Sequence, residues 1–426
     1  MNNHIAKSTA IYTRRFMVND PYFPESPPEN LSLIVVIPAY KEPDISPTLK
    51  SLSQCIAPQG TVEIIVVINA SENAVEEDLI ANQKTINQIK AWEDTISSES
   101  FSIKVIREEK LPEKFAGAGL ARKIGMDEAL RRWALRGIDG VILCLDADCV
   151  VSEDYLIAAE KAFSDHKVQL GHYQFEHLFK EEEDVLLKNG IIQYELHLRY
   201  HFQGLKWAGY PFAIHTVGSC MGVRASTYAR SGGMNRRKAG EDFYFMHKLL
   251  PVSGFVYLPA VVYPSCRSSD RVPFGTGRAQ LEFLANGAIV RNTYHPDTYV
   301  ILKQFFCQVE TLYTVDNFLG LIPHELYGFL QKQNFNARVT EIRSKSKSKE
   351  VFLKNFWQWM DGFMVLKMTH YLRDLNFPET PVTSAANTLI AFLFNQPSAL
   401  DLSDLLLKYR QFDLNYFSRG VTSTDT

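Results

Sequence analysis

Residues 141–148 have the sequence VILCLDAD, in which five apolar residues end at two aspartates. An unbroken apolar run of this length is typical of a strand covered on both faces, as in a parallel sheet. Open α/β sheets bind ligands at the carboxyl ends of such strands. Residues two apart on an extended segment point the same way, so we expect Asp146 and Asp148 to face one ligand together. A plain polar turn after a strand is the alternative.

The residues before this stretch alternate between strand and helix patterns. Apolar runs at 33–37, 62–68 and 102–106 predict strands, and helices are expected between them, near 48–54, 75–92 and 119–136. This alternation predicts a parallel sheet with right-handed crossovers, which is an α/β fold. Further strands are expected at 168–177 and 219–224, and further helices at 152–164, at 184–202 and from 241 onward.

From about residue 280 the strand pattern disappears. Apolar side chains then recur at spacings of four, three, four and three, which predicts one amphipathic helix through Phe352, Phe356, Trp359, Phe363 and Leu366. The prolines before residue 30 indicate an arm laid on the surface. We therefore predict three parts: an N-terminal arm (1–30), an α/β domain (31–279) and a helical C-terminal region (280–426).

Composition limits the class of protein. Of the 426 residues, 46% are hydrophobic and 12% aromatic, which is ample for a sizeable core. The 45 basic and 48 acidic residues give a net charge of −3, which argues against a nucleic-acid partner. Six scattered cysteines without a Cys-x-x-Cys motif indicate a reducing cytoplasm. We see no signal peptide and no membrane span, and a peripheral membrane contact stays open.

Five short motifs occur in one order along residues 31–250. They are IPAYKE at 37–42, VVINAS at 66–71, AGAGLARKIG at 116–125, LDAD at 145–148 and AGEDF at 239–243. In this order they resemble the family 2 glycosyltransferases, which have the GT-A fold. The resemblance implies a metal-dependent enzyme that moves one sugar from a nucleotide-sugar donor to an acceptor hydroxyl.

The resemblance implies a nucleoside pocket at the ends of the first two strands. Pro38, Ala39, Tyr40 and Glu42 would line it, and Glu42 would accept hydrogen bonds from the ribose hydroxyls. The family usually has an acidic residue after the second strand to bind the base, and Asn69 stands there. An amide can still pair with a base edge, so the identity of the base stays open.

Two basic segments are expected near the donor diphosphate. Lys114 and Arg122 lie on either side of a small-residue run that precedes a helix, an arrangement that suits an anion. Arg271 lies in a glycine-containing and arginine-containing segment, 267–278, which we interpret as a lid that closes on the diphosphate. A turn with a surface cation, and a basic surface loop, are the respective alternatives.

For the metal, the resemblance implies that Asp148 is the firmer ligand. Asp146 would bind the ribose or a metal-bound water, and His295 would be a third ligand. The ion would be Mn²⁺ or Mg²⁺, because both prefer carboxylate and phosphate oxygens. An ordinary structural histidine is the alternative for His295.

The chemistry itself is assigned by resemblance to Asp242 and Glu241. Asp242 would take the proton of the acceptor hydroxyl as its oxygen attacks the anomeric carbon, and Glu241 would orient it. This predicts transfer with inversion, with a retaining transferase left open. The alternative is that both acids complement the dipole of the helix that they begin.

The sequence leaves the acceptor and several competing functions open. Aromatic residues at 194–215 suit a carbohydrate or another hydroxyl acceptor, but they also suit a core. The Gln-x-x-Arg-Trp element of processive synthases is missing, which favours transfer of a single sugar. A catalytically silent nucleotide-sugar-binding protein is one alternative. A haloacid-dehalogenase-like phosphatase is another, although there the first aspartate usually ends the first strand and a threonine follows it closely. The oligomeric state is not predicted.

Overall fold

The protein is described here by a computed structural model of residues 2–17, 19–96, 99–252, 254–271, 273–287, 289–316 and 318–417. It divides into two compact units, which are treated separately. The first contains residues 1–188 and 216–282, and the second contains residues 189–215 and 283–416. The predicted boundary at 279 lies close to the third crossing between the units, at 282/283, and the assignment of 189–215 to the second unit was not predicted.

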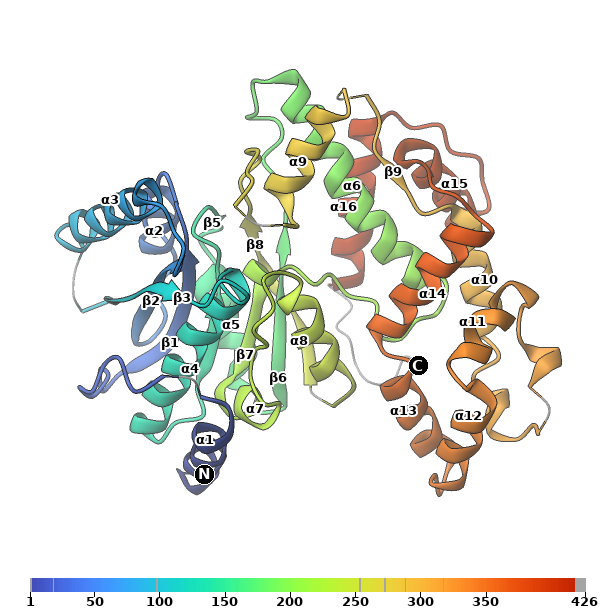
Figure 1. The fold of residues 1–426 in the computed structure, drawn as a ribbon, viewed down its shortest axis with the longest axis horizontal. Helices are drawn as coiled ribbons and strands as arrows, with labels where there is room; N and C mark the ends of the chain where they lie inside the picture. The colour runs from blue at the N-terminus through green and yellow to red at the C-terminus, as the bar shows by residue number, and fades with distance from the viewer. Residues whose placement is uncertain are drawn as a thin grey trace. The chain divides into compact units, whose positions relative to one another are not determined.

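The first unit is built on one eight-stranded mixed sheet with the strand order β3-β2-β1-β4-β7-β6-β8-β5 (Figure 1). The pairs β1–β2, β2–β3, β1–β4 and β6–β8 are parallel, and β7 runs antiparallel to both of its neighbours. The strands are β1 (Leu31–Ala39), β2 (Thr61–Ser71), β3 (Phe101–Leu111), β4 (Val141–Cys144), β5 (Val150–Val151), β6 (Val168–Phe175), β7 (Met221–Arg224) and β8 (Gly254–Tyr263). The predicted α/β fold is confirmed.

Helices of the first unit cover both faces of this sheet. They are α1 (Asn2–Phe16), α2 (Ser46–Ser53), α3 (Glu76–Glu93), α4 (Ala118–Arg136), α5 (Tyr155–Ser164), α7 (Ala225–Arg230), α8 (Glu241–Leu249), α9 (Thr276–Ala285, which runs past the boundary), η1 (Gly218–Cys220) and η2 (Leu250–Val252). Gly125 of α4 lies so close to Val36 that a Cβ there would be 2.4 Å from its Cγ1. Phe163 of α5 packs near Gly222 together with Leu143, which is in register with Val35. Neighbouring residues of a strand face opposite ways, so α4 and α5 cover opposite faces.

The N-terminal segment differs from the predicted arm, because residues 2–16 form helix α1. Ile5 and Tyr12 are buried, each with 1% of its surface exposed. The Tyr12 hydroxyl donates to Asp127 at 2.7 Å and accepts from the Lys123 ammonium at 2.6 Å. The helix is therefore anchored on α4 by a buried polar cluster, which sequence periodicity does not reveal.

The second unit is helical, as predicted for the C-terminal region. Its elements are α6 (Val185–Trp207, most of which lies in this unit), β9 (Asn292–Thr293), α10 (Pro296–Phe306), η3 (Thr311–Tyr313), η4 (Leu319–Leu321), η5 (His324–Leu326), α11 (Tyr327–Lys332), α12 (Phe335–Ser344), α13 (Lys349–Trp359), α14 (Gly362–Leu375), β10 (Thr380–Pro381), α15 (Val382–Phe394) and α16 (Leu402–Phe417). No helix in the described part of the chain is long and apolar enough to cross a bilayer.

The single helix predicted through Phe352 and Leu366 is wrong, because two helices share that aromatic stripe. Helix α13 ends at Trp359, and Asp361 begins α14 by accepting a hydrogen bond from the Met364 amide at 2.9 Å. Aspartate at this position satisfies an amide that the first helical turn leaves free. The spacing of the apolar residues continues across the break and therefore hides it.

Candidate active site

Asp146 and Asp148 lie in a turn at the carboxyl end of β4, not on the extended segment that we expected. The Cys149 amide donates to the Asp146 carbonyl at 3.1 Å and closes the turn. As a result the two carboxylates have different partners: Asp146 binds Arg122, and Asp148 lies next to arginines of the 267–271 segment. The two carboxylates still interact. Burial is the main cause that raises the pKa of Asp148, and the negative charge of Asp146 is the second cause.

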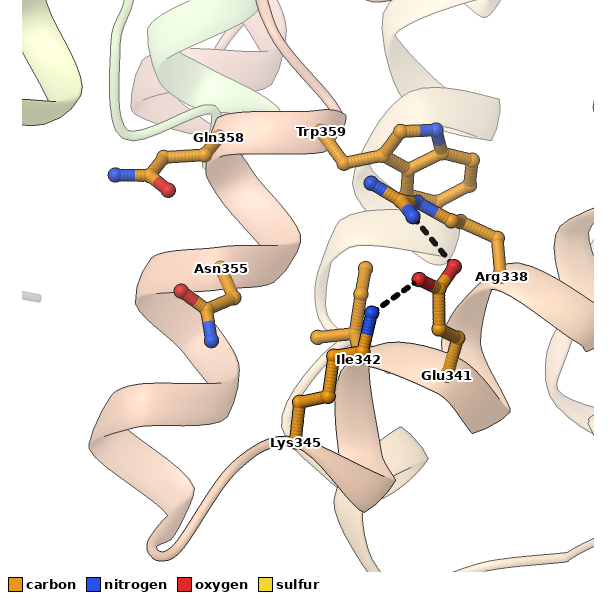
Figure 2. A pocket seen from close by; sticks show the side chains of 7 residues that line it. All are labelled: Arg338, Glu341, Ile342, Lys345, Asn355, Gln358 and Trp359. Carbon is orange, nitrogen blue, oxygen red and sulfur yellow. Dashed lines mark hydrogen bonds and ion pairs between the residues drawn. The ribbon is translucent and has the colours of Figure 1, made fainter.

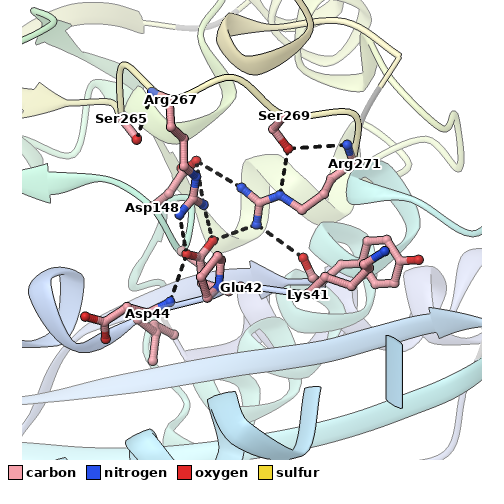
Figure 3. Close-up of polar contacts among 12 residues, drawn as sticks. Lys41, Glu42, Asp44, Asp148, Ser265, Arg267, Ser269 and Arg271 are labelled. Carbon is pink, nitrogen blue, oxygen red and sulfur yellow. Dashed lines mark hydrogen bonds and ion pairs between the residues drawn. The ribbon is translucent and has the colours of Figure 1, made fainter. Parts of the chain in front are cut away.

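Two arginines bridge Glu42 and Asp148 (Figure 3). Glu42 is 1% exposed and accepts from Arg267 Nη1 at 2.8 Å, from Arg267 Nη2 at 2.5 Å and from Arg271 Nη1 at 2.7 Å. The second nitrogens of the two guanidinium groups lie 3.3 and 3.4 Å from Asp148 Oδ2. The 267–271 part of the predicted lid therefore lies on the carboxylates of the strand ends. Val272, also in that segment, lies outside the described residues.

Tyr40 and Lys41 form a second contact surface at the end of β1. The Tyr40 hydroxyl donates to Asp78 Oδ2 at 2.8 Å, and the Lys41 ammonium pairs with Asp78 Oδ1 at 2.8 Å. Lys41 has a φ of +50°, and its amide donates to Asn82 Oδ1 at 3.0 Å, which holds this uncommon conformation. Asp78 and Asn82, which both lie on α3, were not predicted from the sequence. Their signal was a pair of polar residues four apart on the apolar side of a helix.

Asn69 is part of β2 itself, opposite Glu108 of β3, and not of a loop after the strand. It is 3% exposed, and its Oδ1 has no hydrogen-bond partner among the described residues. A buried acceptor without a partner is costly, so a ligand N–H or a water at this atom would be stabilised. Asn82 Nδ2 donates to the Asn69 carbonyl at 3.2 Å and ties this residue to the Lys41 turn.

The other residues predicted to contact the donor have simpler surroundings. Pro38 and Ala39 complete β1, where they are in register with Val67 and Ile68 of β2. Lys114 is exposed, with its ammonium 5.4 Å from the ring centre of Phe115. A donor role for these three residues stays a prediction.

Arg122 is buried between two acids from different parts of the chain. It is 2% exposed; its Nη2 donates to Asp146 Oδ1 at 2.5 Å, and its Nη1 pairs with Glu241. We had expected a guanidinium that meets the donor anion. In this structure the guanidinium already serves two carboxylates.

Glu241 and Asp242 begin helix α8, as predicted. Burial raises the pKa of Glu241 to about 7, and Arg122 opposes this rise. Burial also raises the pKa of Asp242, again opposed by Arg122, while the Phe243 amide donates to Asp242 Oδ1 at 2.7 Å. A carboxyl group with a raised pKa is a better proton acceptor than an ordinary aspartate, which suits a general base.

His295, predicted as a third metal ligand, caps helix α10 in the second unit. Its Nδ1 accepts from the Asp297 amide at 3.2 Å, and its ring stacks on Phe377. Within the described part of the chain, no three histidine, cysteine or acidic side chains are arranged to hold a metal ion.

The aromatic residues at 194–215 belong to the packing of the second unit. Tyr200 is fully buried and donates to the Tyr294 carbonyl at 2.8 Å. His215 is buried against Asp413, at 2.9 Å, and Trp207 stacks on Phe392. These contacts favour the core interpretation over acceptor binding.

A surface hollow of about 320 Å³ lies between α12 and α13 of the second unit (Figure 2). Glu341 at its edge binds both Arg338, at 2.5 Å, and Lys345, at 2.6 Å. Both ion pairs join residues three or four apart along one segment, and the three side chains together keep one positive charge. No residue predicted for the site lies here.

Comparison with known proteins bears on the first unit. Residues 34–228 match the sequence model of the family described as Glycosyl transferase family 2. No curated protein sequence matches the chain significantly.

Several solved structures are similar at low identity. TarS 1–349 of S. aureus is 16% identical, with 74% of this chain and 90% of that chain covered and a TM-score of 0.38. The same protein in complex with UDP-GlcNAc is 14% identical, with 87% and 94% covered and a TM-score of 0.37. The mannosyltransferase PcManGT of Pyrobaculum calidifontis, in complex with GDP-Man and Mn²⁺, is 14% identical, with 88% and 96% covered and a TM-score of 0.36. At these scores the likenesses carry no conclusion about donor or acceptor.

Proposed function

Residues 34–228 of the chain form a family 2 glycosyltransferase domain, and on this premise we propose that the protein transfers one sugar from a nucleotide-sugar donor to an acceptor hydroxyl, with a divalent metal ion and with inversion. The acceptor is a carbohydrate or another hydroxyl compound. We propose a cytoplasmic location, which the scattered cysteines of the sequence favour.

One observation carries this proposal. Within the matched domain and the segment that follows it, a buried Glu42, the Asp146–Asp148 turn and the Glu241–Asp242 pair are linked through arginines. A nucleoside diphosphate needs acceptors for its ribose and cations for its phosphates, and a transferase needs a base at the acceptor. This cluster contains all three kinds of group.

Asp148 suits a divalent ion. Its side chain keeps 28% of its surface exposed, while loss of hydration first and Asp146 second raise its pKa, so a nearby cation would stabilise its charged form. Asp148 would hold the ion, with Asp146 steadying the donor, and His295 keeps its role as a helix cap. The ion would neutralise charge on the leaving diphosphate.

In the proposed reaction Asp242 accepts the proton of the acceptor hydroxyl. The oxygen forms a bond to the anomeric carbon as the bond from that carbon to the nucleoside diphosphate breaks, and the electron pair leaves with the diphosphate. Attack opposite the leaving group inverts the anomeric configuration. Arg267 and Arg271 would exchange their longer contacts with Asp148, at 3.3 and 3.4 Å, for the phosphate oxygens when the donor binds, since a guanidinium group pairs well with phosphate.

The test is release of nucleoside diphosphate from each common nucleotide sugar in the presence of Mn²⁺, with EDTA as the control. Metal-dependent release that increases with an added glycan acceptor supports transfer. Saturable binding without turnover for every acceptor would favour the silent binding protein, and phosphate release from simple esters would favour the phosphatase.

A further inference from the structure

Arg122 connects two parts of the site that are remote in sequence. Asp146 follows β4, Glu241 begins α8, and Arg122 lies in the second turn of α4 with one guanidinium nitrogen on each acid. A guanidinium that is 2% exposed and engaged on two sides is poorly placed to receive an anion from solution. Its position instead suits a structural brace, by which we mean one buried guanidinium that holds Asp146 and Glu241 in place.

Glycines make room for this brace. A Cβ at Gly218 would lie 2.9 Å from Arg122 Nη1 and 3.0 Å from its Cζ. Since real Cβ atoms essentially never approach that closely, any larger residue at 218 would push the guanidinium away from its two acids.

The small residues at 116–119, at the start of α4, lie against the backbone that leads to α8. A Cβ at Gly119 would lie 2.1 Å from the Arg237 carbonyl oxygen and 3.1 Å from the Glu241 Cβ. A Cβ at Gly117 would lie 2.9 Å from the Lys238 carbonyl oxygen. The close approach that these glycines permit is therefore to the chain's own 237–241 segment.

The charges around Arg122 give the brace a chemical consequence. Glu241 and Asp242 face Arg122 from the start of α8, and Asp146 faces it from the turn after β4. Arg122 is the main influence that opposes the rise in pKa that burial imposes on both Glu241 and Asp242. Removal of this positive charge would let the pKa of Glu241 and of Asp242 rise further, so both would bind a proton at higher pH.

Resting on the proposed function, we infer that Arg122 is a positioning residue that holds Asp146 and Glu241 in fixed relation, so that the donor end of the site and the base Asp242 are aligned through one buried guanidinium. The arrangement requires glycine at positions 117, 119 and 218, because a Cβ there would collide with neighbouring atoms. This role differs from direct binding of the donor phosphates.

The first experiment needs no turnover. Stability to heat is measured for Arg122→Gln, Glu241→Gln and the double variant. If the bridge exists in solution, the double variant loses less Tm than the sum of the two single losses, because the second change removes an interaction that is already broken. Additive losses would overturn the bridge whether or not the protein is an enzyme.

The second experiment tests alignment of the base. Arg122→Gln and Gly218→Ala are expected to lower kcat at pH 7 at least about tenfold, within the range that a positioned general base contributes. In Arg122→Gln the acid limb of the kcat profile should move to higher pH, with partial recovery of kcat there. Gly320→Ala is the matched control, since a Cβ at Gly320 meets nothing within 4 Å.

The outcomes separate the inference from the function. Non-additive Tm losses together with an unchanged pH profile of kcat would overturn the positioning role. A higher donor KM with unchanged kcat would also overturn it, because that result is expected of a residue that binds the donor phosphates. If Arg122→Gln fails to fold, Gly218→Ala decides, because it keeps the charge and displaces it. If the unmodified protein releases nucleoside diphosphate from no nucleotide sugar, the proposed function fails, and the Tm cycle still decides the bridge.

Discussion

Replacing Arg271 with alanine should tighten Mn²⁺ binding to the donor-free protein while it slows sugar transfer. Arg271 Nη2 lies 3.4 Å from Asp148 Oδ2, and Arg271 Nη1 lies 2.7 Å from Glu42 Oε2. In the absence of donor the guanidinium thus partly neutralises the carboxylate that we assign to the metal. With donor present, the same guanidinium would be needed on the diphosphate, so the two effects of its removal have opposite signs.

The magnitude follows from the separation of the charges. Two unit charges about 4 Å apart interact by about 1 kcal/mol in water and about 4 kcal/mol at an effective dielectric constant of about 20. Arg271 and Asp148 keep 18% and 28% of their side-chain surface exposed, so screening by solvent favours the lower part of this range. A gain of about 1 kcal/mol corresponds to a Kd for Mn²⁺ that is about fivefold lower.

The assay is a titration of Mn²⁺ into donor-free protein, followed by electron paramagnetic resonance of the free ion. Arg278→Ala is the matched control, because Arg278 stands on the same segment and binds Glu282 at 2.9 Å instead of Asp148. In parallel, kcat/KM for the donor should fall. Unchanged or weaker Mn²⁺ binding by Arg271→Ala would refute the competition between arginine and metal.

Three other substitutions test the remaining assignments. Asp148→Asn should abolish metal-dependent nucleotide binding in calorimetry, and unchanged binding with Mn²⁺ would remove Asp148 as the ligand. Asp242→Asn should keep donor affinity and lower kcat by about 10²–10⁴-fold, and near-normal turnover would exclude Asp242 as the base. Tyr12→Phe should lower the free energy of unfolding by about 1–3 kcal/mol in denaturant titration, because Asp127 and Lys123 lose a buried partner; an unchanged midpoint would mean that α1 is not anchored there.

The pH dependence of nucleotide binding is a further check. Because burial and Asp146 raise the pKa of Asp148, its carboxylate is protonated at a higher pH than an ordinary aspartate. Metal-dependent binding should therefore weaken as the pH falls, beginning above the usual range of aspartate titration. Binding that persists down to the ordinary range would contradict the raised pKa of Asp148.

The elements of the sheet were predictable where local pattern and tertiary environment agree. The apolar runs of β1, β2 and β4 are buried on both faces, so their sequence and their surroundings carry the same information. Helix α1 was missed because its main anchor is the hydroxyl of Tyr12 on Asp127, a contact between distant segments. The break at Asp361 was missed because the aromatic spacing continues across two helices.

The sequence predicts which residues belong to the candidate site better than it predicts which side chains bind one another. Short motifs identified Glu42, Asp146 and Asp242, since each follows or begins an element that the pattern reveals. The partners of these acids could not be derived in that way, because Arg122 and Arg267 reach them only through the arrangement of the sheet. The turn that separates Asp146 from Asp148 depends likewise on backbone geometry after β4.

Glycosyl transfer at this site is tested most directly by mass analysis of the acceptor after incubation with a nucleotide sugar and Mn²⁺, comparing the unmodified protein with Asp242→Asn. We predict an acceptor that is heavier by one sugar residue, formed with one equivalent of nucleoside diphosphate, and no such product from the variant that still binds the donor. An acceptor of unchanged mass with every donor, or equal product from the variant, would contradict the assignment of this strand-end cluster as the active site of a glycosyltransferase.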